Sequence, residues 1–288
     1  MQIENFFDPN TSTISYLVLD ENSRKCALID TVLDYDPKAA RITTASADKL
    51  IERVHALGAT VEWILDTHVH ADHLSANAYL RQALGGKVGI GREVIKVQEI
   101  FKGVFNLDDS FPADGSQFDC LFADGESFHV GSLLFTVLHT PGHTPACVSY
   151  VIASESEQVI VVGDTVFMPD LGTGRCDFPG GDARTLYHSI RRLFRYPAAT
   201  RLLLGHDYPP ATRLVSTWVT IAESRAKNRF INDEVGEEAF VANRKSRDSS
   251  LAMPLLILPS VQVNIRGGNL PEPEKNGTCY LKLPLNTL

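Results

Sequence analysis

The sequence predicts an α+β fold, in which paired strands and amphipathic helices share a chain of 288 residues. Two apolar segments at residues 13–19 and 25–29 are separated by a polar Asp-Glu-Asn-Ser stretch, which is the pattern of a β-hairpin. Residues 48–57 instead place their apolar side chains at helical spacing on one face. Several further apolar segments end just before a histidine or an aspartate, and functional sites often gather at such strand ends.

The first half of the chain alternates between these two patterns. In order, we expect strands at 13–19 and 25–29, a polar connection at 33–44, a helix at 48–57, a strand at 61–65, a helix at 74–84, a strand at 87–90, a helix at 93–101 and a loop at 106–117. Gly58 follows the first helix directly, as is typical of a helix C-terminus.

The second half is richer in strands until its apolar periodicity weakens. In order, we expect strands at 125–130, 133–139, 147–153 and 158–162, a helix at 186–194, a strand at 201–204 and a helix at 218–229. Five prolines follow residue 236, so we expect a largely irregular tail with one strand at 261–265. The sequence therefore predicts a main domain at 1–213 and a C-terminal extension at 214–288 that packs on it.

The composition excludes several classes of protein. A net charge of -8 without a long basic run does not favour electrostatic binding to nucleic acid or to an anionic membrane. The N-terminal residues lack the pattern of a signal peptide, and no apolar run is long enough to span a bilayer. Five scattered cysteines indicate a reducing compartment, so we expect a cytoplasmic protein.

The strongest motif is the segment 66–73, which reads Asp-Thr-His-Val-His-Ala-Asp-His. In an extended chain, alternate residues point the same way, so His68, His70 and Asp72 can address one point in space. We expect a helix to start near Asp72, which would project Asp72 and His73 from its first turn. Imidazole and carboxylate together suit Zn, Fe, Mn or Ni, and the segment therefore predicts a metal site.

Three more candidate ligands follow later strands, each directly after a glycine. His143 stands in Pro-Gly-His, Asp164 in Gly-Asp-Thr and His206 in Gly-His-Asp. Glycine allows the sharp turns and close approaches that such strand ends need. Because strand ends at one edge of a sheet bring distant residues together, we expect these side chains to join His68.

Taken in order over about residues 10 to 210, these motifs resemble the metallo-β-lactamase superfamily. The resemblance implies an αββα sandwich with a metal at one edge and a C-terminal extension packed on the core. Within that superfamily, the segment 172–181 resembles the persulfide dioxygenases rather than glyoxalase II, and so does the Pro-rich tail at 253–288. The human dioxygenase has a cysteine at the position of Thr173, so any role of that thiol does not carry over.

The resemblance implies a persulfide dioxygenase with one Fe(II) per chain, held by His68, His143 and Asp164. The remaining four residues of the constellation would orient these ligands and shape the pocket: His70, Asp72, His73 and His206. The alternative is a glyoxalase II-like hydrolase of glutathione thioesters, in which the same seven residues would bind two Zn ions. Residue types alone do not separate these two readings.

The substrates implied by the first reading are glutathione persulfide and O2, with sulfite and glutathione as products. Because glutathione carries two carboxylates, we expect it to contact nearby basic or hydrogen-bonding side chains. The candidates are Arg175, Tyr208, Arg225, Lys227, Arg244 and Arg247. The resemblance is also compatible with a homodimer.

Overall fold

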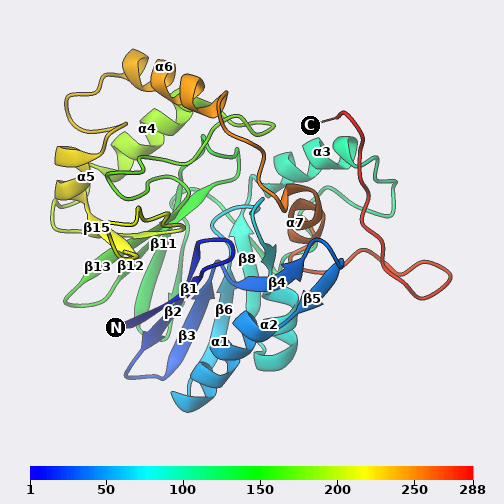
Figure 1. Ribbon diagram of the computed structural model, residues 1–288. Coiled ribbons are helices and arrows are strands. Elements are labelled where there is room, and N and C mark those ends of the chain that lie inside the picture. The colour runs from blue at the N-terminus through cyan, green and yellow to red at the C-terminus, as the bar shows by residue number, and fades with distance from the viewer. Residues whose placement is uncertain (288) are drawn as a thin grey trace.

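The computed structural model describes residues 1–287, which form two six-stranded sheets packed face to face (Figure 1). The first sheet has the order β1 (Gln2–Asp8), β2 (Thr13–Asp20), β3 (Lys25–Ile29), β6 (Thr60–Leu65), β8 (Lys87–Gly91) and β9 (Cys120–Phe122). The second has the order β10 (Ser127–Val130), β11 (Leu133–His139), β12 (Val148–Ala153), β13 (Gln158–Gly163), β14 (Arg201–Leu204) and β15 (Trp218–Thr220).

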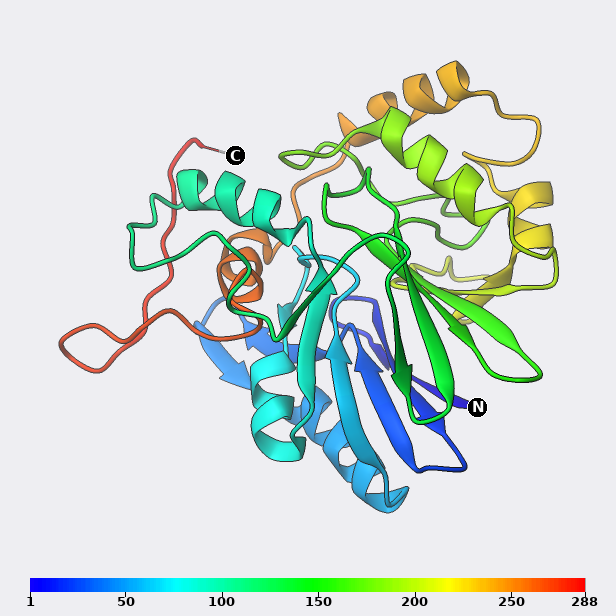
Figure 2. The same ribbon diagram turned by 180° about the vertical axis from the view of Figure 1, so that it is seen from behind.

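Helices cover both outer sides of this sandwich, as the front and back views show (Figures 1 and 2). On the side of the first sheet lie α1 (Ala45–Ala56) and α2 (Asn77–Leu84), with α3 (Val94–Val104) and α7 (Ile257–Asn264) beyond them. On the side of the second sheet lie α4 (Ala183–Leu193), α5 (Ile221–Lys227) and α6 (Glu237–Asp248). A small sheet joins β5 (Arg41–Thr43), β4 (Val32–Asp36) and β7 (Leu74–Ser75).

The alternation of side chains along β2 explains the layers. Tyr16 and Val18 belong to the core between the two sheets, whereas Leu17 and Leu19 belong to the core under the helices. Because successive residues of a strand point to opposite faces, a strand that is apolar on both faces must be covered on both. The α+β class and the αββα sandwich expected from the sequence are thus confirmed.

Two predictions near the ligand segment are wrong. Residues expected to form a polar connection instead form the hairpin β4–β5, whose polar side chains hide the strand pattern. The helix expected from residue 74 starts only at Asn77, because Leu74 and Ser75 pair with β4. The strands β1 and β9 at the edges of the first sheet were also not predicted.

The C-terminal extension is more regular than its prolines suggest. Trp218–Thr220 extends the second sheet as β15 before α5 begins, with the Thr220 side chain as its N-cap. The expected irregular segment after residue 236 contains α6, whose buried side includes Arg244 and Asp248 and therefore lacks an apolar stripe. The expected strand at 261–265 belongs to helix α7, in which five consecutive residues from Ser260 are buried.

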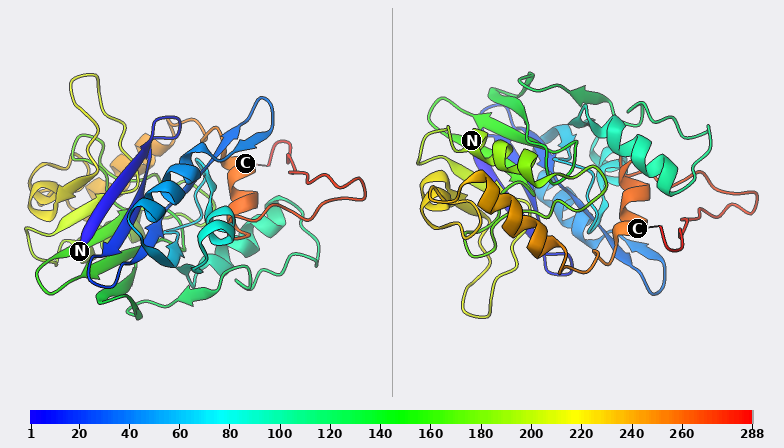
Figure 3. Two further views of the ribbon diagram at one scale, coloured as in Figure 1. Left: turned by 90° about the horizontal axis from the view of Figure 1, so that it is seen from below. Right: turned by 90° about the horizontal axis from the view of Figure 1, so that it is seen from above.

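Views from below and above place α7 beside the first sheet and show the chain after it running outward (Figure 3). The extension therefore contributes both a strand and a buried helix to the body of the molecule. Among residues 1–287, no helix combines the length and the apolar composition needed to cross a membrane.

Candidate metal centre

The segment 66–73, below called the ligand loop, follows β6 and lies where the ends of the two sheets meet. It is irregular rather than helical, and Asn77 begins the next helix. Its start is held by Asp30, which accepts hydrogen bonds from the Thr67 amide at 2.7 Å and the Thr67 hydroxyl at 2.9 Å. A further backbone bond from the Val148 amide to the Thr67 carbonyl ties the loop to the second sheet.

The predicted first set of ligands is brought together. One ligand atom each from His68, His143 and Asp164 lies within 4.8 Å of the others. His143 Nδ1 donates to the Arg175 carbonyl at 2.6 Å, which leaves Nε2 facing Asp164 Oδ2 at 3.5 Å. The Thr67 hydroxyl donates its single proton to Asp30, so the hydroxyl oxygen accepts a hydrogen bond from His68 Nδ1 at 3.0 Å. Because Nδ1 carries the ring proton, His68 Nε2 has a lone pair that can bind a metal.

A second set, formed by His70, Asp72 and His73, lies beside the first. His70 Nε2 donates to Asp30 Oδ1 at 3.0 Å, and His73 Nδ1 donates to Asp72 Oδ2 at 3.0 Å. Asp72 Oδ2 also accepts from the Thr13 hydroxyl at 2.9 Å. An oxygen that a metal could use is therefore already engaged by two donors from the protein.

Asp164 and His206 connect the two sets. Asp164 Oδ1 lies 3.4 Å from His206 Nε2, which in turn lies 3.5 Å from Asp72 Oδ2. Burial alone would lower the pKa of His206, but the Asp164 and Asp72 carboxylates raise it above its ordinary value. The carboxylate of Asp164 is thus placed to serve either one metal or two neighbouring ones.

The donor atoms fit a metal ion. Across residues 1–287, four buried atoms of the constellation have no hydrogen-bond partner: His68 Nε2, His70 Nδ1, His73 Nε2 and Asp164 Oδ1. Burial lowers the pKa of His68 and of His70 well below the ordinary value, so both imidazoles are neutral. Neutral imidazole is the form that binds metal, and leaving such lone pairs buried and unpaired would otherwise be costly.

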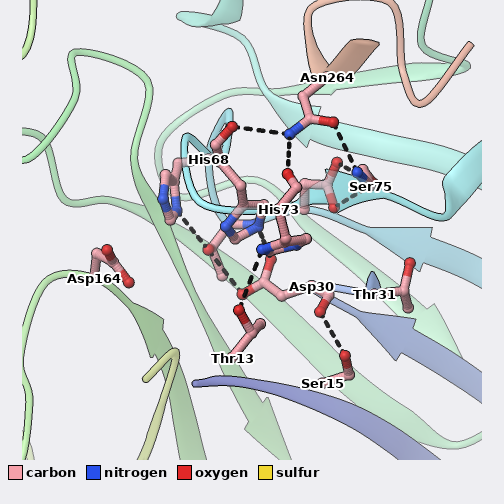
Figure 4. Close-up of polar contacts among 12 residues, drawn as sticks. Thr13, Ser15, Asp30, Thr31, His68, His73, Ser75, Asp164 and Asn264 are labelled. Atoms are coloured by element: carbon pink, nitrogen blue, oxygen red, sulfur yellow. Dashed lines mark hydrogen bonds and ion pairs between the residues drawn. The ribbon is translucent and has the colours of Figure 1, made fainter. Parts of the chain in front are cut away.

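Three positions around the ligand loop were missed by the sequence analysis: Thr13, Asp30 and Asn264. Asp30 follows the apolar strand β3 directly, so the same strand-end pattern that identified His68 could have identified it. Asn264 bonds the loop from the far end of the chain (Figure 4), and we find no local sequence signal for it. Thr13 opens β2 and looks like an ordinary strand residue.

A cavity of about 870 Å³ opens next to the first set of ligands, with Asp164, His143 and Asp72 in its wall. Four of the predicted substrate residues line it: Arg175, Tyr208, Arg244 and Arg247. Apolar rings of Phe167 and Phe178 face the same space. The cavity therefore combines a metal-binding wall with basic and aromatic groups.

The four lining residues are not equally available. Arg175 forms two bonds to the Asp177 carboxylate, and Arg244 is buried against Asp248 at 2.6 Å. Arg247 is exposed at the wall and, within the described part of the chain, forms no ion pair. It is the lining arginine with a free guanidinium.

Two of the predicted substrate residues lie elsewhere. Arg225 pairs with Asp233 at 2.9 Å, and Lys227 pairs with Glu223 at 3.2 Å on the same helix. Neither is among the described residues that line the cavity. Each has a nearby carboxylate of its own, and this placement does not support a role in substrate binding.

The chain matches a known protein family and is similar to named proteins over its whole length. Residues 10–206 match the metallo-beta-lactamase superfamily. The chain is 55% identical to a probable metallo-hydrolase of Burkholderia pseudomallei (strain 1710b) over 100% of both proteins. It is 47% identical to glyoxylase B2 of Dictyostelium discoideum over 100% of this chain and 98% of that protein.

Similarity extends to a dioxygenase. The chain is 31% identical to human mitochondrial persulfide dioxygenase ETHE1, over 78% of this chain and 74% of that protein. Among solved structures, ETHE1 from Myxococcus xanthus superposes with a TM-score of 0.74 at 30% identity, covering 93% of this chain and 100% of that chain. At this coverage, the structural likeness includes most of the C-terminal extension.

Proposed function

We propose that this chain, which belongs to the metallo-β-lactamase superfamily, is a persulfide dioxygenase using one Fe(II) held by His68, His143 and Asp164. The observation that carries this proposal is the asymmetry of the centre. The first set has a free His68 nitrogen and an Asp164 oxygen without a partner, whereas Asp72 of the second set, which also lines the cavity, already accepts bonds from Thr13 and His73. Two histidines and one carboxylate are the ligand set of non-haem Fe(II) oxygenases.

The similarity to human persulfide dioxygenase and to ETHE1 from M. xanthus supports this proposal. The reaction would convert glutathione persulfide, O2 and water into glutathione and sulfite, which takes two oxygen atoms from O2 and one from water. Bound iron would supply positions at which the terminal sulfur and O2 meet. We place this activity in the reducing cytoplasm, where the five free cysteines would stay thiols.

The chain's own residues would bind and orient the substrate. Arg247 would hold a substrate carboxylate at the wall of the cavity through charge-assisted hydrogen bonds. Phe167 and Phe178 would keep bulk water away from the reacting sulfur. The Arg175 carbonyl would keep His143 in the tautomer that turns Nε2 toward the metal.

A specific observation also favours the hydrolase. His70 Nδ1 and His73 Nε2 lack partners among the described residues, as they would if a second metal bound there. The 47% identity to glyoxylase B2 points the same way. In that reading two Zn ions, bound by all seven residues, would lower the pKa of a water that attacks a glutathione thioester.

The two functions are separated by measuring metal content and O2 uptake on one anaerobically purified sample. About one iron per chain, with O2 consumed only after glutathione persulfide is added, is the result expected of a dioxygenase. Two zinc ions per chain, no O2 uptake and cleavage of a glutathione thioester would overturn the proposal in favour of the hydrolase.

A further inference from the structure

We propose that Asn264, in the C-terminal helix α7, is a positioning residue that sets the metal affinity of the centre from outside it. Its side chain touches no candidate ligand atom but holds the backbone of the ligand loop. The inference rests on the proposal above only in requiring that a metal binds at the His and Asp constellation. It applies whether one metal or two is bound.

The carboxamide of Asn264 is fully used on the ligand loop and the residues next to it. Its Nδ2 group donates to the backbone carbonyls of His70 and of His73, each at 2.8 Å. Its Oδ1 accepts from the Ser75 amide at 2.7 Å. Figure 4 shows the amide pointing at this backbone, and Asn264 itself is only 1% exposed. One side chain therefore fixes both ends of the second set of ligands.

A second observation shows that α7 is fitted closely at this point. Gly268, just past the helix, has a φ of +84°, and a Cβ atom placed there would come within 2.9 Å of the Ser75 carbonyl. Gln98 donates to the Ile265 carbonyl at 2.9 Å and ties the end of α7 to α3. The close backbone approach and the left-handed conformation both require glycine at 268.

The bonds made by Asn264 reach the metal-binding atoms through His70. The His70 ring donates to Asp30, and its centroid lies 4.1 Å from that of His68. Asp30 also holds the Thr67 amide and hydroxyl, and that hydroxyl accepts from His68 Nδ1. A shift of the loop backbone at residue 70 would therefore change the orientation of His68 as well as that of His70.

Loss of the amide would leave two carbonyls and one N–H buried without partners. The ligand loop would then rearrange in the metal-free protein, and metal binding would have to restore the order that Asn264 now supplies. Outer residues that orient metal ligands typically contribute about 10- to 100-fold to metal affinity. We expect a loss in that range for the Asn264→Ala variant of the full chain.

The same helix offers a matched control. Gln262 is equally buried, and its side chain donates to the Leu258 and Lys282 carbonyls and accepts from the Lys282 amide. It thus makes as many bonds as Asn264, but to its own helix and to Lys282 of the C-terminal segment instead of the ligand loop. The Gln262→Ala variant should lose thermal stability while keeping the metal affinity of the wild type.

The experiment titrates Co(II) into metal-free full-length protein, with the dissociation constant from chelator competition and the geometry from the Co(II) absorption spectrum. Asn264→Ala should bind Co(II) at least about tenfold more weakly and with a changed spectrum. Asn264→Asp keeps the size but loses both donated bonds, and should behave like Asn264→Ala. Affinities within twofold of Gln262→Ala, at equal loss of melting temperature, would overturn the inference.

A measurement on the wild type covers the case in which the Asn264 variants do not fold. Coupling between two sites is reciprocal, so Co(II) should slow hydrogen exchange of the α7 amides more than that of the α1 amides. Equal protection of both helices would overturn the role of Asn264. A wild type that binds no Co(II) would instead overturn the proposed function itself, and the two failures are thus distinguishable.

Discussion

The two halves of the centre have the same kinds of side chain but differ in how the protein uses them. The half formed by His68, His143 and Asp164 has His143 and Asp164 in the cavity wall, and its His68 Nε2 has no partner within residues 1–287. The half formed by the ligand loop after His68 also reaches the cavity, through Asp72 and His73, but Asp72 is bonded to Thr13 and the loop backbone is bonded to α7. Among the described residues, Asp164 Oδ1 accepts no hydrogen bond whereas Asp72 Oδ2 accepts two, and we therefore call the first the open half and the second the closed half.

This difference indicates that residue type does not decide how many metals bind. Histidine and carboxylate are suitable ligands in both halves, but a carboxylate oxygen whose lone pairs already accept two hydrogen bonds has less capacity left for a metal. The number of metals bound then depends on neighbours such as Thr13, which are not ligands themselves.

Removing a ligand of the open half should abolish the centre. The His68→Ala variant loses a neutral imidazole of the first set of ligands, and we expect metal affinity to fall by more than about 100-fold, with loss of activity. Metal content after gel filtration and O2 uptake would measure this. His188→Ala is the control, because that histidine is exposed on α4. Full activity of His68→Ala would contradict the comparison.

Opening the closed half should change the number of metals bound. The Thr13→Val variant keeps the shape of the side chain but removes the hydroxyl that bonds Asp72 Oδ2. A hydrogen bond to a charged group contributes about 1.5 to 3 kcal/mol, so affinity for a second metal should rise about 10- to 100-fold. Zn(II) titration would show the stoichiometry moving from one toward two per chain.

Thr11→Val provides the comparison for that variant, because it removes a nearby hydroxyl that bonds Asp8 and Thr13 but not Asp72. A Thr13→Val protein that still binds one metal per chain would show that something other than this hydroxyl limits the second half. Two metals per chain in the wild type would remove the difference between the halves altogether.

The cavity side should also contain a substrate contact that leaves the chemistry unchanged. Arg247→Ala removes a free guanidinium from the cavity wall, and we expect KM to rise about three- to tenfold with kcat unchanged, since the interaction is uniform along the reaction. Steady-state kinetics with glutathione persulfide measures both constants. Lys227→Ala, outside the cavity, should leave both unchanged; equal effects of the two variants would argue against a specific contact.

A stability change far from the centre should leave metal binding unaffected. Burial opposes ionisation of Asp20, but hydrogen bonds from Ser23, Ser132 and Asn22 lower its pKa from 3.8 to about 2. Because this folded pKa lies below the ordinary one, the stabilisation is complete above pH 4 and is lost as the pH falls toward 2.

The Asp20→Asn variant should therefore be less stable at pH 7 by about 1 to 2 kcal/mol, with the difference vanishing near pH 2. Urea unfolding at both pH values measures this, and Co(II) affinity at pH 7 should match the wild type. A weaker affinity would mean that general stability, and not the local arrangement of the two halves, sets metal binding.

The sequence predicted the parts of the centre that follow strands, and missed those that depend on distant packing. His68, His143, Asp164 and His206 could be found because apolar strands and glycines mark their positions. Asn264 could not, because the alternating Val-Gln-Val-Asn of α7 resembles a strand, and only burial on nearly all sides explains that pattern in a helix. Substrate contacts were predicted least well, since paired and free basic residues look alike in a sequence.

The hydrogen bonds from Asn264 of α7 to the ligand loop also affect the order in which the centre can form. Asn264 lies 194 positions after His70, so the ribosome synthesises every candidate ligand before the residue that holds their loop. During translation the ligand loop therefore exists for a time without its C-terminal support, when its histidines could bind metals indiscriminately. Delivery of the correct metal is consequently best timed after synthesis, once the last helix has closed over the loop.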